Sequence, residues 1–225
     1  MKKLWGLFLK EKFPQRILVY IIGLYFAALG VVFAVNSALG VSPFNSFPYI
    51  LSRVTGMTMG VCSTIVLVFC IVLQVVILRR KFKLINITQI LFSFFFGFFV
   101  DFNRFLLGSA QIPSYFGQLL MLAISIFLIA LGVTLYLLAN LIPLPPEGVV
   151  LAIVQVRPQN PFHRVKIIMD SSVVAMGILF SILALGGLYG IREGTIISAV
   201  FIGKAMPPVR KFVEPKLRRL RLLPS

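Results

Sequence analysis

The hydrophobic positions of this chain form long uninterrupted runs. About 20 consecutive apolar residues carry an α-helix across a bilayer. Six such runs occur, at residues 17–39, 58–78, about 87–107, 118–139, about 166–188 and about 193–209. The last run is the weakest, because only its stretch TIISAVFIGKAM is clearly apolar. The pattern predicts an all-α polytopic membrane protein with six transmembrane helices, forming a single membrane domain over residues 1–225.

Polar residues and helix breakers interrupt the apolar pattern after the first and the fourth span. The segments are GVSPFNSF, residues 40–47, and LIPLPPEGV, residues 141–149. Proline is well tolerated in the first turn of a helix, and a serine before it suits an N-cap. We therefore expect short or re-entrant helices at about 43–54 and 145–155, with Ser42 as the first N-cap. Two plain extramembrane loops are the alternative.

Composition supports the membrane assignment. Only 12% of the residues are charged, against about a quarter in soluble domains, and the mean hydropathy is +1.01. The net charge of +16 could indicate nucleic acid binding. However, the basic residues cluster between apolar runs, which is the pattern of membrane topology, so no nucleic acid is expected.

The basic residues also predict an orientation. If the N-terminus is cytoplasmic, all but Arg53, Arg104 and Arg192 of the 22 Lys and Arg residues face the cytoplasm, as the positive-inside rule requires. The run at 17–39 exceeds the roughly 7–15 residues of a signal peptide's apolar region, so we expect it to remain as a span. Both termini are then cytoplasmic, and the basic tail at 210–225 is expected to contact anionic lipid.

Short sequence matches predict an internal repeat. ALGV occurs at 28–31 and at 130–133, and the same offset of 102 places Pro145 on Pro43 and Glu147 on Asn45. ITQILFSFFFG at 87–97 also matches EGTIISAVFIG at 193–203 with an offset of 106. Chance similarity between apolar segments is the alternative.

The repeats would cover about 17–107 and about 118–209, with three spans each. An odd number of spans inverts the second copy relative to the first. Such 3+3 inverted repeats, with broken segments at equivalent positions, are typical of secondary transporters.

Three motifs resemble, in their order, the YitT/YczE family of bacterial integral membrane proteins. They are GVSPFNSFPYILSRVTGMTMG, VKIIMDSSVVAMG and GGLYGIREGTIISAVFIGK, and the resemblance covers about residues 17–212. It implies a multi-pass protein of the bacterial cell membrane, expected to be a transporter, in the short form without a C-terminal soluble domain. The chain departs from the family at Asn45, where an acid is expected, and at Glu147, where aspartate is expected.

The candidate substrate-binding residues lie in the interrupted segments and in the fifth span. They are Ser42, Pro43, Asn45, Ser46, Pro145, Glu147 and Asp170. If an in-plane two-fold axis relates the halves, both short helices should begin close together near the bilayer midplane. Their N-termini would then face one cavity suited to a zwitterion or an anion.

Each charged candidate also has a structural reading. Glu147 could bind a proton, a cation or an amine, or merely stabilise a helix start. Asp170 could line the site, because charges in spans are usually functional, or could only pair with Lys166 four residues earlier.

Other polar residues have simpler interpretations. Arg192, Glu193 and Thr195, before the last span, could form a gate or a solvated loop. Asp101 and Arg104, three residues apart, are expected to pair with each other. Interhelical hydrogen bonds are expected from Asn36, Gln74 and Asn140.

Three functions compete. A secondary transporter of a small polar, zwitterionic or anionic metabolite is favoured. An auxiliary protein that scaffolds or regulates a partner is the alternative, and a membrane-embedded enzyme is third. No nucleophile–base arrangement is visible and His163 has no ligand partners at metal-binding spacing, so we expect no enzyme, metal or cofactor. Contact with the lipid bilayer is expected, and a homo-oligomer is left open.

Overall fold

The computed structural model describes residues 13–220 and 222–223, which form helices joined by short connections, without a strand. The α-helices are α2 (Phe13–Asn36), α3 (Pro43–Thr55), α4 (Met59–Leu78), α5 (Gln89–Leu107), α6 (Tyr115–Leu138), α7 (Pro145–Val156), α8 (Phe162–Leu185) and α9 (Glu193–Arg219). Two 3₁₀-helices, η1 (Arg79–Lys81) and η2 (Leu84–Thr88), connect α4 to α5. The basic residues at 2, 3, 10 and 12 that entered the topology prediction lie outside the described residues.

Among the residues that the structure describes, five helical segments are long and apolar enough to cross a membrane. They are Phe13–Asn36, Met59–Lys81, Leu84–Leu107, Tyr115–Leu138 and Arg164–Leu185. The predicted sixth span lies within α9, which has sufficient length but is too polar, because charged residues recur from Lys204 onward. The all-α polytopic class is confirmed; five of the described segments meet the composition requirement, and a sixth crossing by α9 stays a prediction.

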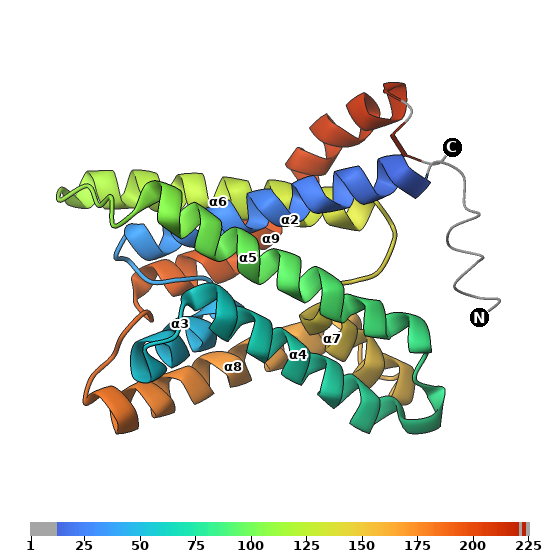
Figure 1. Ribbon diagram of the computed structural model, residues 1–225, viewed down its shortest axis with the longest axis horizontal. Coiled ribbons are helices and arrows are strands. Elements are labelled where there is room, and N and C mark those ends of the chain that lie inside the picture. Colours follow the sequence, from blue (N-terminus) through green and yellow to red (C-terminus); the bar gives the residue numbers. More distant parts are fainter. Residues whose placement is uncertain (1–12, 221, 224–225) are drawn as a thin grey trace.

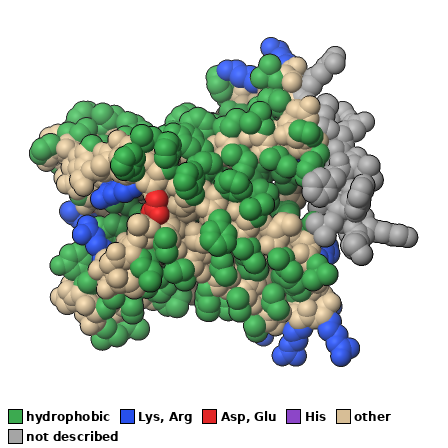
Figure 2. All heavy atoms as spheres, viewed as in Figure 1, with side chains coloured by type: hydrophobic (Ala, Val, Ile, Leu, Met, Phe, Trp, Pro, Cys, Tyr) green, Lys and Arg blue, Asp and Glu red, His purple; other side chains and the backbone are tan. Residues whose placement is uncertain are grey.

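The outer surface is built to contact lipid. Large side chains such as Phe105, Phe116 and Leu183 are at least three-quarters exposed. Figure 2 shows one face covered mainly by hydrophobic side chains, with Lys and Arg mostly near the edges of that face. A soluble protein would leave this surface in water at a large free-energy cost.

Helices α2 and α6, the central pair of the hydrophobic core, lie side by side along the upper part of the view in Figure 1. They approach so closely that a Cβ added to Gly30 would lie 2.9 Å from the Ser125 carbonyl oxygen, and one added to Gly132 would lie 2.5 Å from that of Gly23. Low-numbered residues of α2 meet high-numbered residues of α6, so the helices are antiparallel. An offset of 102 converts Gly23 into Ser125 and Gly30 into Gly132 (125 − 23 and 132 − 30). The offset therefore maps the contact of Gly30 with Ser125 onto the contact of Gly132 with Gly23. A two-fold axis between the two halves produces this relation.

The two short helices begin where the prolines predict, at Pro43 and Pro145. Each packs against a long helix of the other half of the chain: α3 against α8, and α7 against α4 (Figure 1). This reciprocal exchange is again the pattern that a two-fold axis produces.

Helix boundaries repeat as well. Both ends of α6 lie 102 residues after those of α2 (115 − 13 and 138 − 36). After these helices, Ala38 and Asn140, also 102 apart (140 − 38), both take positive φ angles, 58° and 49°. The repeat itself remains a prediction, which these equivalences support.

One helix contact breaks the symmetry. Helix α4 packs closely on α5, where a Cβ on Gly97 would lie 2.5 Å from the Gly60 carbonyl oxygen. By contrast, α8 and α9 are not a packed pair in the described structure. A Cβ on Gly203, the equivalent of Gly97 at offset 106, would meet nothing within 4 Å.

Candidate functional site

Glu147 occupies the third position of α7, inside the membrane domain. Its side chain is partly buried, and its Oε2 atom is fully buried without a hydrogen-bond partner in the structure. Pro145 and Pro146 occupy the first two positions and have no N–H group. The start of α7 is therefore a weaker anion site than the sequence led us to expect, and its most prominent polar group is an acid.

Two charged residues of α8 act on Glu147. The Lys166 Nζ atom lies 2.8 Å from Asp170 Oδ1, and each of these side chains is 28% exposed. Both residues interact electrostatically with the Glu147 carboxyl group, Lys166 more strongly. The predicted pair of Lys166 and Asp170 is confirmed, and the structure brings it together with Glu147.

Two tyrosines face the same acid from the central helices. The Tyr136 hydroxyl on α6 is placed to hydrogen-bond the Glu147 carboxyl group. The Tyr20 hydroxyl on α2 is buried, has no partner in the structure and also interacts electrostatically with Glu147. We call Glu147, Lys166, Asp170, Tyr136 and Tyr20 the Glu147 cluster.

Sequence reasoning missed Tyr20 and Tyr136 and gave Lys166 only a structural role. The tyrosines carried no usable signal, because each lies within a long apolar run and nothing in the sequence relates it to Glu147. Lys166 could have been found, since a charge flanked by apolar residues in a span needs a partner.

A buried amide pair holds the first turn of α7 in place. Gln74 of α4 donates from Nε2 to Gln89 Oε1 at 2.8 Å and to the Pro145 carbonyl oxygen at 3.2 Å. The interhelical hydrogen bond predicted for Gln74 is therefore confirmed. These hydrogen bonds fix the position of the first turn of α7, and therefore of Glu147, along α4 and α5.

The polar residues at the start of α3 bond mainly to one another. Ser42 occupies the N-cap position, but its side chain does not cap the helix; its Oγ accepts a hydrogen bond from Asn45 Nδ2 at 2.8 Å instead. Ser46 is fully buried and donates to the Pro43 carbonyl oxygen at 2.6 Å. The predicted side-chain cap is thus wrong, because Asn45 takes the hydroxyl group.

The structure does not bring these α3 residues to Glu147 by direct helix packing, since α3 and α7 are not a packed pair among the described helices. Neither of the two pockets described below is lined by Ser42, Asn45, Ser46 or Glu147. A substrate-binding role for the α3 residues stays a prediction.

The predicted gate residues pack against the connection between α2 and α3. Arg192 Nη1 donates to the Ala38 carbonyl oxygen at 3.0 Å, and its side chain pairs with Glu193 at 3.2 Å on the surface. Thr195 is buried at the start of α9, and its Oγ1 accepts a hydrogen bond from the Arg192 backbone N–H at 3.4 Å. These contacts tie the start of α9 to the segment that leads into α3.

The expected pair of Asp101 and Arg104 is wrong. Asp101 accepts hydrogen bonds from the Thr58 hydroxyl at 2.6 Å and the Gly60 N–H at 2.7 Å. Arg104 donates to Asn36 Oδ1 at 2.6 Å, so Asn36 does make its predicted interhelical bond. Asp101 thus accepts a hydrogen bond from the Gly60 N–H, which has no partner within α4 because it lies at the helix start. The spacing of Asp101 and Arg104 on α5 could not predict this contact with another helix.

A large groove separates α4 from α8. Its volume is about 1570 Å³, and residues of α3 and α7 line its two ends. Cys70 on its wall interacts electrostatically with Glu147 and Lys166. The groove therefore runs alongside the Glu147 cluster.

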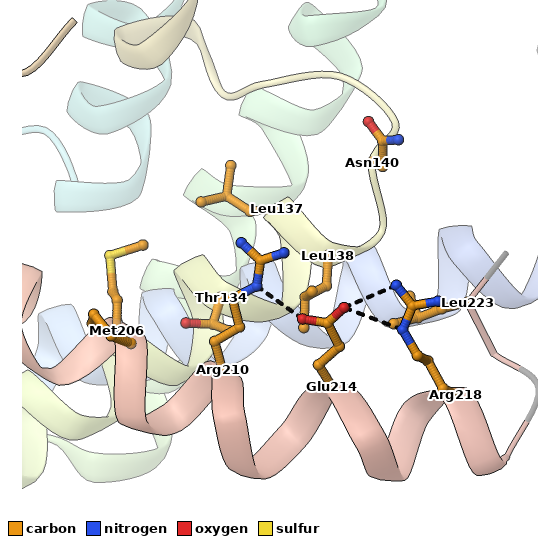
Figure 3. A pocket seen from close by; sticks show the side chains of 10 residues that line it. Thr134, Leu137, Leu138, Asn140, Met206, Arg210, Glu214, Arg218 and Leu223 are labelled. Atoms are coloured by element: carbon orange, nitrogen blue, oxygen red, sulfur yellow. Dashed lines mark hydrogen bonds and ion pairs between the residues drawn. The ribbon is translucent and has the colours of Figure 1, made fainter. Parts of the chain in front are cut away.

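A second pocket, of about 480 Å³, lies between α6 and α9 (Figure 3). Glu214 pairs there with Arg210 and Arg218, each at 2.9 Å, as the dashed lines mark. Hydrogen bonds from Arg210 and then Arg218 hold the pKa of Glu214 below its ordinary value. All three side chains come from one helix, which makes this a cation-rich surface feature of α9. Among the described residues, no three His, Cys, Asp or Glu lie close enough to hold a metal ion.

Comparison with known proteins identifies relatives without a known activity. A family described as "Family of unknown function (DUF6198)" matches residues 14–211. The chain is 28% identical over 199 residues to "Uncharacterized membrane protein YczE" of Bacillus subtilis, covering 87% of this chain and 85% of that protein. It is 24% identical over 206 residues to "Uncharacterized protein YyaS" of the same organism, covering 91% and 99%. No solved structure matches significantly. The resemblance to YczE-type membrane proteins is confirmed.

Proposed function

The chain belongs to this family of unknown function, and on that premise we propose that it is a secondary transporter of a small polar, zwitterionic or anionic metabolite. The observation that carries the proposal is the Glu147 cluster within the membrane domain. Ionisable residues inside spans are costly, and those that persist usually mark substrate or ion pathways.

The bonding of Glu147 favours a positively charged ligand group. A buried carboxylate oxygen without a partner costs free energy that a bound donor would recover. A proton, a coupling cation or the amine of a zwitterion could supply that partner. Lys166 lies close enough to interact with a substrate carboxylate, since it already interacts with two acids.

The arrangement of the two halves fits alternating access. In transporters built from inverted repeats, one half rocks against the other around a site formed at broken helices. Here α3 and α7 are such short helices, and each packs against the opposite half. A relative motion of the halves would therefore move α7, with Glu147, against α4 and against Tyr20 on α2 of the other half.

Location and orientation belong to the same proposal. The basic residues favour a cell-membrane protein with both termini in the cytoplasm. The end of α7 and the tail of α9 then lie toward the cytoplasmic side.

Transport by proteoliposomes tests the proposal. Purified protein is screened by thermal shift against amino acids and small carboxylic acids, and uptake of the stabilising compounds is measured. We expect Glu147→Gln to reduce uptake at least about tenfold, the effect of losing one charge-assisted contact, while the melting temperature stays close to that of the wild type.

Glu214→Gln is the matched control, because Glu214 is an acid of another helix whose ion pairs lie outside both the Glu147 cluster and the predicted gate. It should transport like the wild type. Equal uptake by the Glu147→Gln and wild-type proteins would contradict the proposed role of the cluster.

A further inference from the structure

The groove between α4 and α8 has apolar walls along most of its length. Phe69 and Leu73 of α4 face Ile168 and Met176 of α8, with Phe47 of α3 and Ile153 of α7 toward the ends. Ser172 is the one hydroxyl group among the groove-lining residues. The walls offer few partners for a polar solute, so the chemistry of the groove differs from that of the Glu147 cluster.

One end of the groove is strongly basic. Its lining there includes Arg79, Arg80 and Lys81 of η1, together with Arg157 after α7 and Arg164 at the start of α8. All five are exposed, and none has an acidic partner among the residues that the structure describes. The end of α4 and the start of α8 both line this end of the groove, on the side that the charge pattern predicts to be cytoplasmic.

The length of the groove matches one acyl chain. Ile65 and Leu78 line it along α4 and are 13 residues apart (78 − 65), which corresponds to about 20 Å of helix. The hydrocarbon of one leaflet is about 15 Å thick, half of the bilayer core. An apolar channel of this length with cations at one end is complementary to an amphiphile with an anionic head.

We propose that this groove binds an anionic phospholipid of the cytoplasmic leaflet, with its phosphate at the basic end and an acyl chain between α4 and α8. Basic pockets between transmembrane helices on the cytoplasmic side bind such head groups by charge attraction and hydrogen bonding. The lipid fills the space between two helices that do not pack on each other. The bound lipid thereby keeps α4 and α8 apart.

The charges argue against a second copy of the chain as the occupant. A dimer axis along the membrane normal would bring the five cations of one copy close to the five of the other, and like charges repel. An anionic lipid neutralises the same cations.

Native mass spectrometry of the delipidated protein in a mild detergent tests the proposal. Phosphatidylglycerol and phosphatidylcholine with identical acyl chains are added separately. We expect the wild type to bind one phosphatidylglycerol at least about tenfold more tightly than phosphatidylcholine. The double variant Arg157→Gln/Arg164→Gln should lose about tenfold or more in affinity for phosphatidylglycerol, because each cation near the lipid surface contributes to its binding.

The double variant Arg53→Gln/Lys204→Gln is the charge-matched control, since both residues are exposed, lie outside the basic tail and do not line the groove. Its affinity for phosphatidylglycerol should stay within about twofold of that of the wild type. Such a change is well below the roughly tenfold loss expected when a cation that contacts the lipid is removed. A second pair tests the acyl chain. Ser172→Trp fills the groove and should abolish binding, whereas Ser171→Trp, exposed outside the groove, should not.

Equal affinity for the two lipids, or equal binding by the groove and control variants, would overturn the proposal. A dimer that Ser172→Trp disrupts would assign the groove to a second copy and also overturn it. Binding is measured without transport, so this result is independent of the uptake experiment.

Discussion

At the scale of single residues, two glycines test the packing of the central helices. A Cβ on Gly132 would lie 2.4 Å from the Ala27 backbone nitrogen, whereas one on Gly203 would meet nothing within 4 Å. We expect Gly132→Ala to destabilise the protein by about 1–3 kcal/mol, since helix backbones cannot yield as side chains do. Gly203→Ala should be neutral or stabilising by up to about 1 kcal/mol, because alanine favours the helix.

Thermal unfolding of both variants in the same detergent measures the difference. Equal melting temperatures for the two variants would show that α2 and α6 do not approach as closely as described.

A second residue-scale prediction concerns the titration of Glu214. Arg210 and Arg218 hold its pKa below the ordinary value of 4.5. The stabilisation from these pairs is therefore complete above the ordinary pKa and is lost as the pH falls through the lower, folded-state pKa. Carbon-13 NMR of the labelled carboxyl group should show a midpoint below 4.5.

Arg210→Gln/Arg218→Gln removes both donors and should raise that midpoint toward the ordinary value. A wild-type midpoint at or above 4.5 would contradict the pairing.

At the scale of elements, a disulfide tests whether α3 packs on the opposite half of the chain. A Cβ on Gly177 of α8 would lie 3.6 Å from the Ser46 Oγ atom of α3, a spacing compatible with a disulfide. In a background with Cys62→Ala and Cys70→Ala, Ser46→Cys/Gly177→Cys should oxidise almost completely. Intact-mass measurement after thiol alkylation reports the free cysteines.

Ser46→Cys/Gly203→Cys is the control and should stay reduced, since no neighbour lies close to Gly203. A reduced Ser46–Gly177 pair would mean that α3 does not dock on α8.

The elements also show what the sequence could predict. The starts of α3 and α7 were predicted correctly, because proline restricts where a helix can begin and this restriction is local. The docking of these helices was not predictable, since hydrophobic periodicity identifies a buried face but not its partner. Asp101 was misassigned for the same reason: the N–H group of Gly60, 41 positions away in the chain, binds it.

The candidate site was predicted only in its charged residues. Glu147 and Asp170 stood out because acids are rare in apolar segments. Tyr20 and Tyr136 did not, because tyrosine is unremarkable in a membrane protein and only the crossing of α2 with α6 brings the two together. The grouping of Ser42, Asn45 and Ser46 with Glu147 rested on symmetry alone, and α3 and α7 are not a packed pair among the described helices.

At the scale of the whole molecule, the account depends on inversion of one half relative to the other. Antiparallel packing of α2 and α6, the exchanged contacts of α3 and α7, and the offset of 102 between helix ends all support that relation. An inverted second half requires that the connections between spans alternate strictly between the two sides of the membrane.

Cysteine labelling in intact cells tests this alternation most directly. Single cysteines are placed at Ser109, Tyr189, Arg80 and Gln159, which are all exposed in the structure, in a background without Cys62 and Cys70. A membrane-impermeant maleimide should label the first two positions from outside and reach the other two only after the cells are permeabilised. Labelling at Gln159 in intact cells would place the connection between α7 and α8 outside and contradict the inverted arrangement.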